Sequence, residues 1–216
     1  MQSMKMQIQD VGFAAAEQKS SAKALTVREL LHHADTGAGA VFGTGDAAIF
    51  EDSVAYRALP GGGIEMMQPL EGLTFGVAIK FEETVPEVML TCISDLAAFK
   101  NTLRFYAKDD VGACYIMKAC GMLRTVCVSN HSFSNAAKVP QQALFENTRG
   151  RIVGIYFPAC AKSAKSPEWQ FYYLSGDKSQ GGFVLDLSAD CLHMKLNKIE
   201  RLDLLPQSRK ENKRRP

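Results

Sequence analysis

Apolar and polar residues alternate along much of this chain, which is the pattern of β-strands with one buried face. The clearest case is the stretch 73–81, where every second residue is large and apolar: Phe75, Val77, Ile79 and Phe81. Other apolar stretches predict a hairpin over 47–58 and strands over 114–117, 122–128, 143–146, 151–157, 169–174, 183–187 and 191–205. Turn residues predict a tight turn at 147–150 and a longer one at 176–182. The pattern therefore predicts a protein in which strands predominate.

Two stretches predict short helices instead. Thr26 and Glu29 have the spacing of a capping box, which predicts a helix that ends near His33. Ser94 can cap a second helix, because apolar residues then recur at helical spacing as far as Ala107. A few helices among many strands indicate a fold of the α+β class.

Composition narrows the class of protein. With 216 residues, of which 46% are hydrophobic, the chain can bury a substantial core as one large domain or two small ones. No apolar run approaches the roughly 18 residues that a membrane span needs, and Met1–Asp10 lacks the apolar core of a signal peptide. We therefore expect no membrane association and a cytoplasmic location. The six cysteines never form a C-x-x-C motif, so we expect reduced, buried thiols rather than disulfides.

The net charge of +2 is unevenly distributed, because the tail 208–216 holds five basic residues against Glu211 alone. The rest of the chain is therefore slightly acidic. A nucleic-acid partner would depend on this tail, which has no aromatic residue for base stacking. The charge pattern favours a small-molecule partner over nucleic acid.

The predicted hairpin 169–187 brings three side chains toward one point. Gln170 and Tyr172 share a face of the first strand, and Phe183 begins the return strand after a Gly-Gly turn. Three histidines in such positions could bind a metal ion as a tripod. This chain has a carboxamide, a phenol and a phenyl group there instead.

Several short motifs occur in an order and spacing that resemble the acetolactate decarboxylase family, from about residue 25 to 206. They are Leu25-Thr-Val-Arg-Glu-Leu30, Asp35-x-Gly-x-Gly39, Gly150-Arg-Ile-Val-Gly-Ile-Tyr-Phe-Pro158 and Gly181-Gly-Phe-Val-Leu185. The resemblance implies an α+β fold of two mixed or antiparallel sheet subdomains. We expect an N-terminal sheet subdomain over 1–130, a C-terminal antiparallel sheet or barrel over 131–207, and a basic tail over 208–216. It also implies a homodimer joined through the N-terminal sheet.

The family's zinc ligands are absent from this chain. In the family, a His-x-His strand and a His after the Gly-Gly turn hold a zinc ion that chelates the substrate's carbonyl and hydroxyl oxygens. The matching residues here are Gln170, Tyr172 and Phe183, so we expect no zinc and no other cofactor. A family Thr falls on Ala40, and an acidic residue falls on Ala47. The four histidines lie outside the tripod, and we expect them to be ordinary surface or hydrogen-bonded residues: His32, His33, His131 and His193.

Two alignments remain open for the family's pocket Arg, which follows the long strand. A gapless alignment places Ser129 there, whereas a shifted one uses Arg124. The family's C-terminal extension, which supplies a further Glu, is replaced by a shorter basic tail in which only Glu211 could substitute.

These residues predict a metal-independent, acetolactate-decarboxylase-like biosynthetic lyase. It would act on a small keto-acid or polyketide-like intermediate by decarboxylation, cyclisation or rearrangement. We expect Tyr172 to donate a hydrogen bond or proton to a carbonyl oxygen, Gln170 to orient it, and Arg124 or Glu200 to handle charge. The expected substrate-binding residues are Phe183, Ser129 and Ala47. The alternative is a non-catalytic binding or regulatory protein that reuses this fold.

Overall fold

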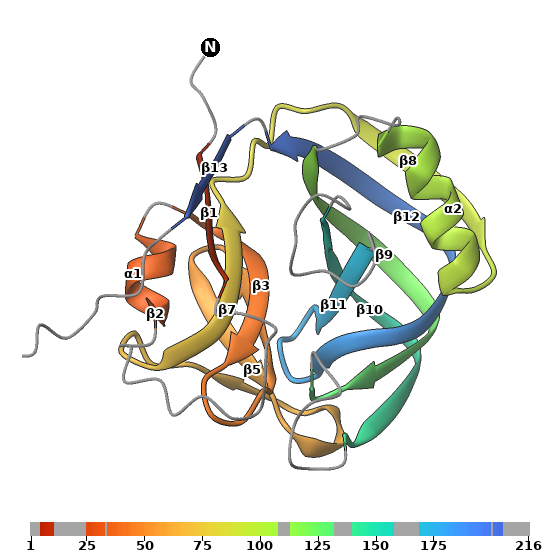
Figure 1. Ribbon diagram of the computed structural model, residues 1–216. Coiled ribbons are helices and arrows are strands. Elements are labelled where there is room, and N and C mark those ends of the chain that lie inside the picture. Colours follow the sequence, from red (N-terminus) through yellow and green to blue (C-terminus); the bar gives the residue numbers. More distant parts are fainter. Residues whose placement is uncertain are drawn as a thin grey trace, which may run out of the picture.

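Two β-sheets pack against each other in the computed structural model, which describes residues 5–10, 25–32, 34–107, 113–131, 140–157, 169–199 and 201–204 (Figure 1). The strands of the first sheet are β1 (Lys5–Asp10), β2 (Leu25–Thr26), β3 (Thr36–Val41), β4 (Ala47–Glu51), β5 (Val54–Ala58), β6 (Ile64–Met66), β7 (Gly72–Ile79) and β13 (Arg201–Leu204). Those of the second are β8 (Glu87–Ile93), β9 (Cys114–Ser129), β10 (Gln142–Tyr156), β11 (Trp169–Ser175) and β12 (Gly181–Ile199). The helical segments are α1 (Val27–Leu31), α2 (Leu96–Ala107) and a 3₁₀ turn at Pro60–Gly62.

The first sheet has the order β13-β1-β7-β3-β4-β5-β6, with β2 also paired to β7. One of its faces packs against α1, whose Leu30 is fully buried there. Its other face packs against the second sheet and carries the alternating residues of β7, Phe75, Val77 and Ile79, as the sequence predicted. The capping box of α1 is also confirmed, since Thr26 accepts a hydrogen bond from the Glu29 amide and the Glu29 carboxylate accepts one from the Thr26 amide.

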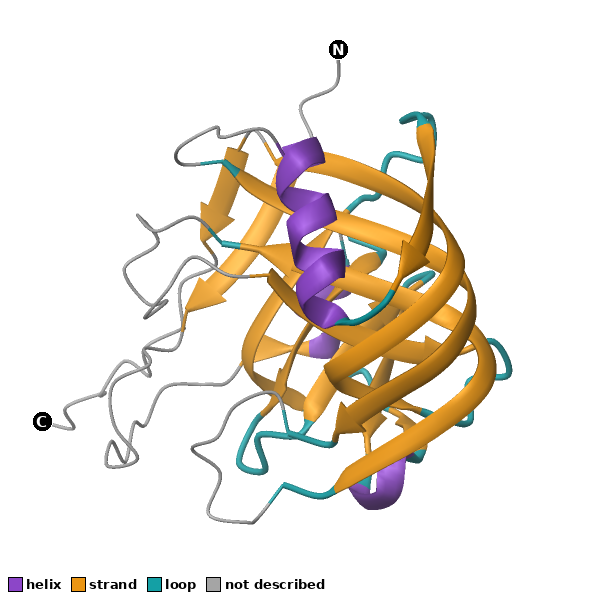
Figure 2. Ribbon diagram, turned by 90° about the vertical axis from the view of Figure 1, so that its right-hand side faces the viewer, coloured by secondary structure: helices purple, strands orange, loops and turns teal. Residues whose placement is uncertain are grey.

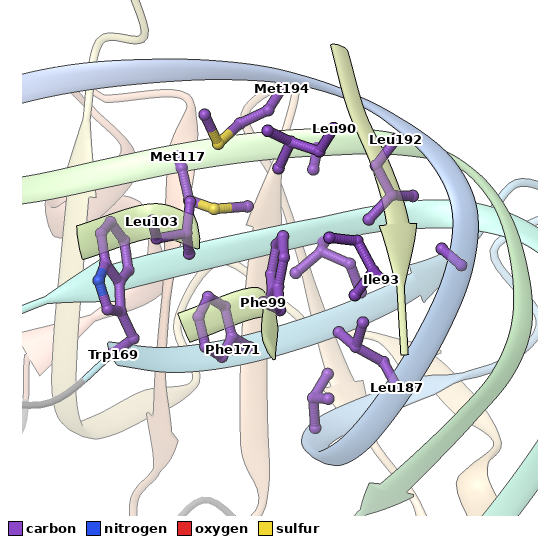
Figure 3. Close-up of a cluster of buried hydrophobic side chains, with 14 of the residues drawn as sticks. Leu90, Ile93, Phe99, Leu103, Met117, Trp169, Phe171, Leu187, Leu192 and Met194 are labelled. Carbon is purple, nitrogen blue, oxygen red and sulfur yellow. The ribbon is translucent and has the colours of Figure 1, made fainter. Parts of the chain in front are cut away.

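The second sheet has the order β11-β10-β9-β12-β8, and β11 also pairs with β12. The four strands β9 to β12 therefore close into a barrel, and α2 lies along one side of it (Figure 2). Phe99 and Leu103 of α2 insert among the inward side chains of the strands, and the Phe99 and Phe171 rings lie 5.1 Å apart (Figure 3). The barrel interior is thus a packed hydrophobic core.

Three local predictions differ from the structure. The separate short strands predicted within 114–128 and within 143–157 are the long continuous strands β9 and β10. The predicted strand 183–187 is part of β12, which runs from 181 to 199, and the predicted strand 191–205 is divided between β12 and β13. The turn predicted at 147–150 is absent, because β10 continues through it: Glu146 and Thr148 on either side of Asn147 keep their partners on β9 without a shift of register. Asp95 rather than Ser94 caps α2, since its carboxylate accepts the Ala98 amide at 2.7 Å.

The division between the sheets also differs from the boundary expected at residue 130. β8 and β9 precede that position but pair with β12, so they belong to the second sheet. β13 lies near the end of the chain yet pairs with β1 in the first sheet. The cysteines of the described residues are all free thiols, but only Cys114 is buried as expected, whereas Cys127 and Cys191 are partly buried and Cys92 and Cys120 are exposed. No helix within the described ranges is long and apolar enough to cross a membrane.

Candidate active site

The three tripod positions come together in the structure. Tyr172 on β11 and Phe183 on β12 are directly paired, and their rings meet edge to face with centroids 5.5 Å apart. Gln170 lies two residues before Tyr172 on the same face, and the Tyr172 hydroxyl donates to the Gln170 Oε1 at 3.4 Å. This bond is long and therefore weak. The predicted convergence is thus present in the fold.

These side chains lie at the interface between the two sheets. Tyr172 is fully buried, whereas Gln170 and Phe183 are each partly exposed. Ala47, at the start of β4, is fully buried in the same apolar cluster as Tyr172. The phenol therefore lies in a mainly apolar environment, and Gln170 connects it to the protein surface.

Of the two residues considered for the family's Arg position, only Ser129 reaches this region. Ser129 is buried at the end of β9 and is the direct partner of Phe183. Arg124 lies five residues earlier on the same strand, about 16 Å away at the rise of an extended chain. Its guanidinium is half exposed and binds Asp190 at 2.8 Å and the Ile93 carbonyl at 3.1 Å. Arg124 is thus held on a different part of the barrel.

Two further residues named from the sequence cannot be placed. Glu200, expected to handle charge, and Glu211 in the basic tail both lie outside the described residues. No acidic or basic side chain among the residues expected to form the site therefore lies beside Tyr172 in the described part of the chain.

A polar cluster at the end of β9 was missed by the sequence interpretation, which treated His131 as a surface or satisfied residue. His131 is 4% exposed, and its Nδ1 has no hydrogen-bond partner among the described residues. Its nearest acidic group is the Asp46 carboxylate, 4.0 Å away. Asn130, between Ser129 and His131, binds the Ala47 amide through its carbonyl at 2.7 Å. The available signal was the position of His131 directly after the long strand.

The donor set at the tripod positions does not fit a zinc ion. A phenyl group has no donor atom, and a neutral phenol and a carboxamide are poor substitutes for imidazole. Within the ranges that the structure describes, no three His, Cys, Asp or Glu side chains are grouped as a metal ion would require.

A separate groove of about 690 Å³ lies between β10 and the turn that joins β11 to β12. Two carboxylates line it: Glu146, which is exposed on β10, and Asp177, which accepts hydrogen bonds from Ser175 and Ser179 that lower the pKa of its carboxyl group. Because Asp177 is committed to shaping the turn, the interface around Tyr172 is the stronger candidate.

The described fold, two packed sheets of which one is closed into a barrel that α2 covers on one side, defines an α+β protein with a candidate site between its sheets. The model of the alpha-acetolactate decarboxylase family matches residues 13–214. The chain therefore belongs to the alpha-acetolactate decarboxylase family.

Individual relatives are distant. An alpha-acetolactate decarboxylase of Brevibacillus brevis is 24% identical over 191 residues, which are 83% of this chain and 65% of that protein. The chain thus spans just under two thirds of this curated relative. The alpha-acetolactate decarboxylase of Bacillus subtilis strain 168 superposes with a TM-score of 0.77 at 17% identity, over 93% of this chain and 88% of the other. A Staphylococcus aureus protein of unknown function, similar to alpha-acetolactate decarboxylase, gives a TM-score of 0.73 at 16% identity over the same shares. These structures confirm the fold.

Proposed function

We propose that this protein is a metal-independent lyase of the acetolactate decarboxylase family that acts on a small β-keto acid. The observation that carries the proposal is the pair of polar side chains, Tyr172 and Gln170, within the mainly apolar interface at the family's metal position. Burying a phenol and placing a carboxamide beside it costs free energy that a wholly apolar pair would avoid. Their presence supports a chemical role rather than simple filling.

The phenol of Tyr172 can replace part of what a metal ion does. When a β-keto acid loses carbon dioxide, the bond to the carboxyl carbon breaks and its electron pair moves onto the carbonyl, which becomes an enolate. A phenol that donates to this oxygen stabilises the developing charge, and the effect is larger in an apolar environment. The bond from Tyr172 to Gln170 is 3.4 Å long and therefore weak, so giving up this bond for one to a substrate oxygen costs little.

Gln170 and its neighbours would position the substrate. The carboxamide can hold the phenol through its oxygen and present its NH₂ group to a carboxylate or carbonyl, because it is partly exposed. Ala47 and the edge of Phe183 would contact an apolar substituent, and the Ser129 hydroxyl is a further polar group on the adjoining strand. This lining fits a small keto acid better than a large or highly charged molecule. Arg124 has no place in this mechanism.

The test is Tyr172→Phe, which removes one oxygen and almost no volume. We expect the release of carbon dioxide from a panel of β-keto acids, including acetolactate, to fall by about 10²-fold or more. The weak hydrogen bond predicts a loss of stability of no more than about 1 kcal/mol. Gln170→Leu should lower the same rate.

Tyr173→Phe is a matched control, because Tyr173 is the next residue and faces the barrel interior, where its hydroxyl pairs with Thr148 at 2.7 Å. This variant should lose about 1 kcal/mol of stability and keep its activity. Equal rates in the wild type, Tyr172→Phe and Gln170→Leu would contradict the catalytic proposal.

A second candidate function is a non-catalytic binding or regulatory protein. The observation that favours it is the complete burial of Tyr172 among apolar side chains, because a ring enclosed in this way can stabilise the interface by packing alone. On this alternative no β-keto acid is turned over, and Tyr172→Phe changes neither the melting temperature nor ligand binding beyond the effect seen for Tyr173→Phe.

A further inference from the structure

Four side chains with sulfur or imidazole donor atoms lie side by side on the outer face of the barrel. Cys120 of β9 is paired with His193 of β12. Two residues further along β9, Met122 is paired with Cys191. The immediate neighbours of these four along the strands belong to the barrel core, so the four side chains point outward. Those neighbours are Ala119, Leu123 and Leu192. We call the four outward residues the soft-donor cluster.

Such residues are unusual on a sheet face that contacts water. The solvent-facing side of an antiparallel sheet normally carries polar side chains. Here Cys120 is exposed, Met122 is 52% exposed and Cys191 is partly exposed. Met89 of β8, which is paired with His193 on its other side, is 61% exposed. Thiols and thioethers are therefore presented together to solvent, where they add little to the packing of the core.

The imidazole of His193 is oriented as in a metal ligand. Its Nδ1 lies 3.0 Å from the Oε1 atom of Glu87, the first residue of β8. An ionised carboxylate only accepts hydrogen bonds, so in the neutral imidazole Nδ1 carries the proton and Nε2 keeps its lone pair. Metal-binding histidines almost always donate their second N–H to a carboxylate, a carbonyl or a water in this way. Glu87 is therefore a positioning residue for His193.

The spacing of the soft-donor cluster suits one ion above the sheet. Paired residues on antiparallel strands have Cβ atoms about 4.5–5.5 Å apart, and residues two apart on one strand lie about 7 Å apart on the same face. Two residues of one strand and one of its neighbour can thus reach a common ion. Among the described His, Cys, Asp and Glu side chains, no three already meet at one point. The ion would gather its donors by rotation about side-chain bonds, for which these exposed positions leave room.

The donor atoms favour a soft ion. Magnesium and calcium require oxygen ligands, which the cluster lacks. Two thiolates and one imidazole could also serve zinc, but zinc sites make no use of thioethers. Thiolate and thioether ligands together select Cu(I). Met122 within the cluster and Met89 beside it therefore favour Cu(I) over zinc.

We propose that the soft-donor cluster is a surface site for Cu(I), whose ligands are drawn from Cys120, Met122, Cys191 and His193. The site goes beyond the proposed function, because none of its residues belongs to the apolar cluster around Tyr172. Each thiol that becomes a ligand releases its proton to solvent, and copper keeps its oxidation state on binding.

The test is a competition for Cu(I) between the full chain and the chelator bicinchoninate, without oxygen and with the thiols reduced. We expect the wild type to withdraw one equivalent of Cu(I) from the coloured complex. Cys120→Ser and His193→Phe should each weaken binding by about tenfold or more, and Met122→Leu by a smaller factor. Glu87→Gln should weaken binding only while His193 is present, and should have no further effect in the His193→Phe background.

Cys127→Ser is the matched control. Cys127 lies on the same strand, five residues beyond Met122 and about 16 Å away at the rise of an extended chain. This variant also loses one thiol but should bind Cu(I) as the wild type does. The substitutions in the cluster change exposed or partly exposed side chains, so the variants should fold with nearly unchanged melting temperatures. If one of them fails to fold, the others still decide the matter.

The proposal is overturned if the wild type does not compete for Cu(I), if Cys120→Ser and His193→Phe bind as the wild type does, or if Cys127→Ser loses as much affinity as they do. Zinc is the second probe, and binding of zinc as tight as that of Cu(I) would overturn the choice of ion. X-ray absorption spectroscopy of the Cu(I) complex should show sulfur neighbours, and a shell of nitrogen and oxygen alone would contradict the ligand set. None of these results depends on turnover of β-keto acids, so this site and the proposed function are tested separately.

Discussion

Removal of the Arg151 side chain should loosen the junction between the two sheets. Glu51 at the end of β4 is 3% exposed and is bound by Arg151 of β10, with Lys178 of the turn before β12 at 3.7 Å. The hydrogen bond to Glu51 is also the main cause that raises the pKa of Arg151. In Arg151→Ala, the buried Glu51 carboxylate keeps only the weaker contact with Lys178 among the described cations. This poorly compensated charge is the source of the expected loss of stability.

The magnitude follows from how far each partner is buried. Breaking a buried ion pair costs about 3–5 kcal/mol. The Arg151 side chain is 47% exposed, so solvent screening reduces the expected cost by about half, to about 1.5–2.5 kcal/mol. For a chain of this length, that loss corresponds to a fall in melting temperature of about 4–8 °C.

Thermal denaturation followed by circular dichroism measures this shift, and Arg149→Ala is its control. Arg149 is exposed two positions earlier on β10, so its loss should cost no more than about 0.5 kcal/mol. In the double variant Glu51→Gln/Arg151→Ala, the loss of stability should be smaller than the sum of the losses in the two single variants, because the Glu51 charge that Arg151 pairs with is absent. Equal shifts for Arg151→Ala and Arg149→Ala would refute the idea that this pair joins the sheets.

Three further predictions concern metal, pH and assembly. Purified protein should contain no stoichiometric zinc and should keep any activity in EDTA; one zinc per chain, with activity lost to EDTA, would show that the tripod alignment is wrong. Hydrogen bonds from Lys118 and then Lys195 lower the pKa of Glu83 below its usual 4.5, so the stability it contributes is present above that pH and lost as the pH falls through the lowered value. Denaturation of Glu83→Gln should accordingly show a weaker loss of stability between about pH 5 and 3 than the wild type. Light scattering should give a dimer, about twice the chain mass of 23.7 kDa, and a strict monomer would contradict the assembly implied by the family.

Local sequence signals predicted several elements well. The capping box of Thr26 and Glu29 depends only on residues three positions apart, and the buried face of β7 depends only on alternation. Patterns of this kind are fixed by neighbouring residues and can be interpreted without the fold.

Features that depend on distant pairing were not predictable in this way. Asn147 has a positive φ of 49° and resembles a turn residue, but the ladder to β9 continues on either side of it. The alternatives Arg124 and Ser129 could be separated only when Ser129 was found opposite Phe183. His131 gave no signal beyond its place after a strand, because its burial arises from the contact of β4 with the end of β9.

The parallel pairing of β1 with β13 affects how this chain can fold. Lys5 is matched with Arg201 and Ile8 with Leu204, so the first sheet takes its outermost strand from a segment almost 200 residues further along the chain. Such a contact carries a large cost of loop closure and forms late. During synthesis, the first sheet can therefore acquire its last strand only after the whole barrel has been made. The edge of β1 is an open template for pairing with another chain until then.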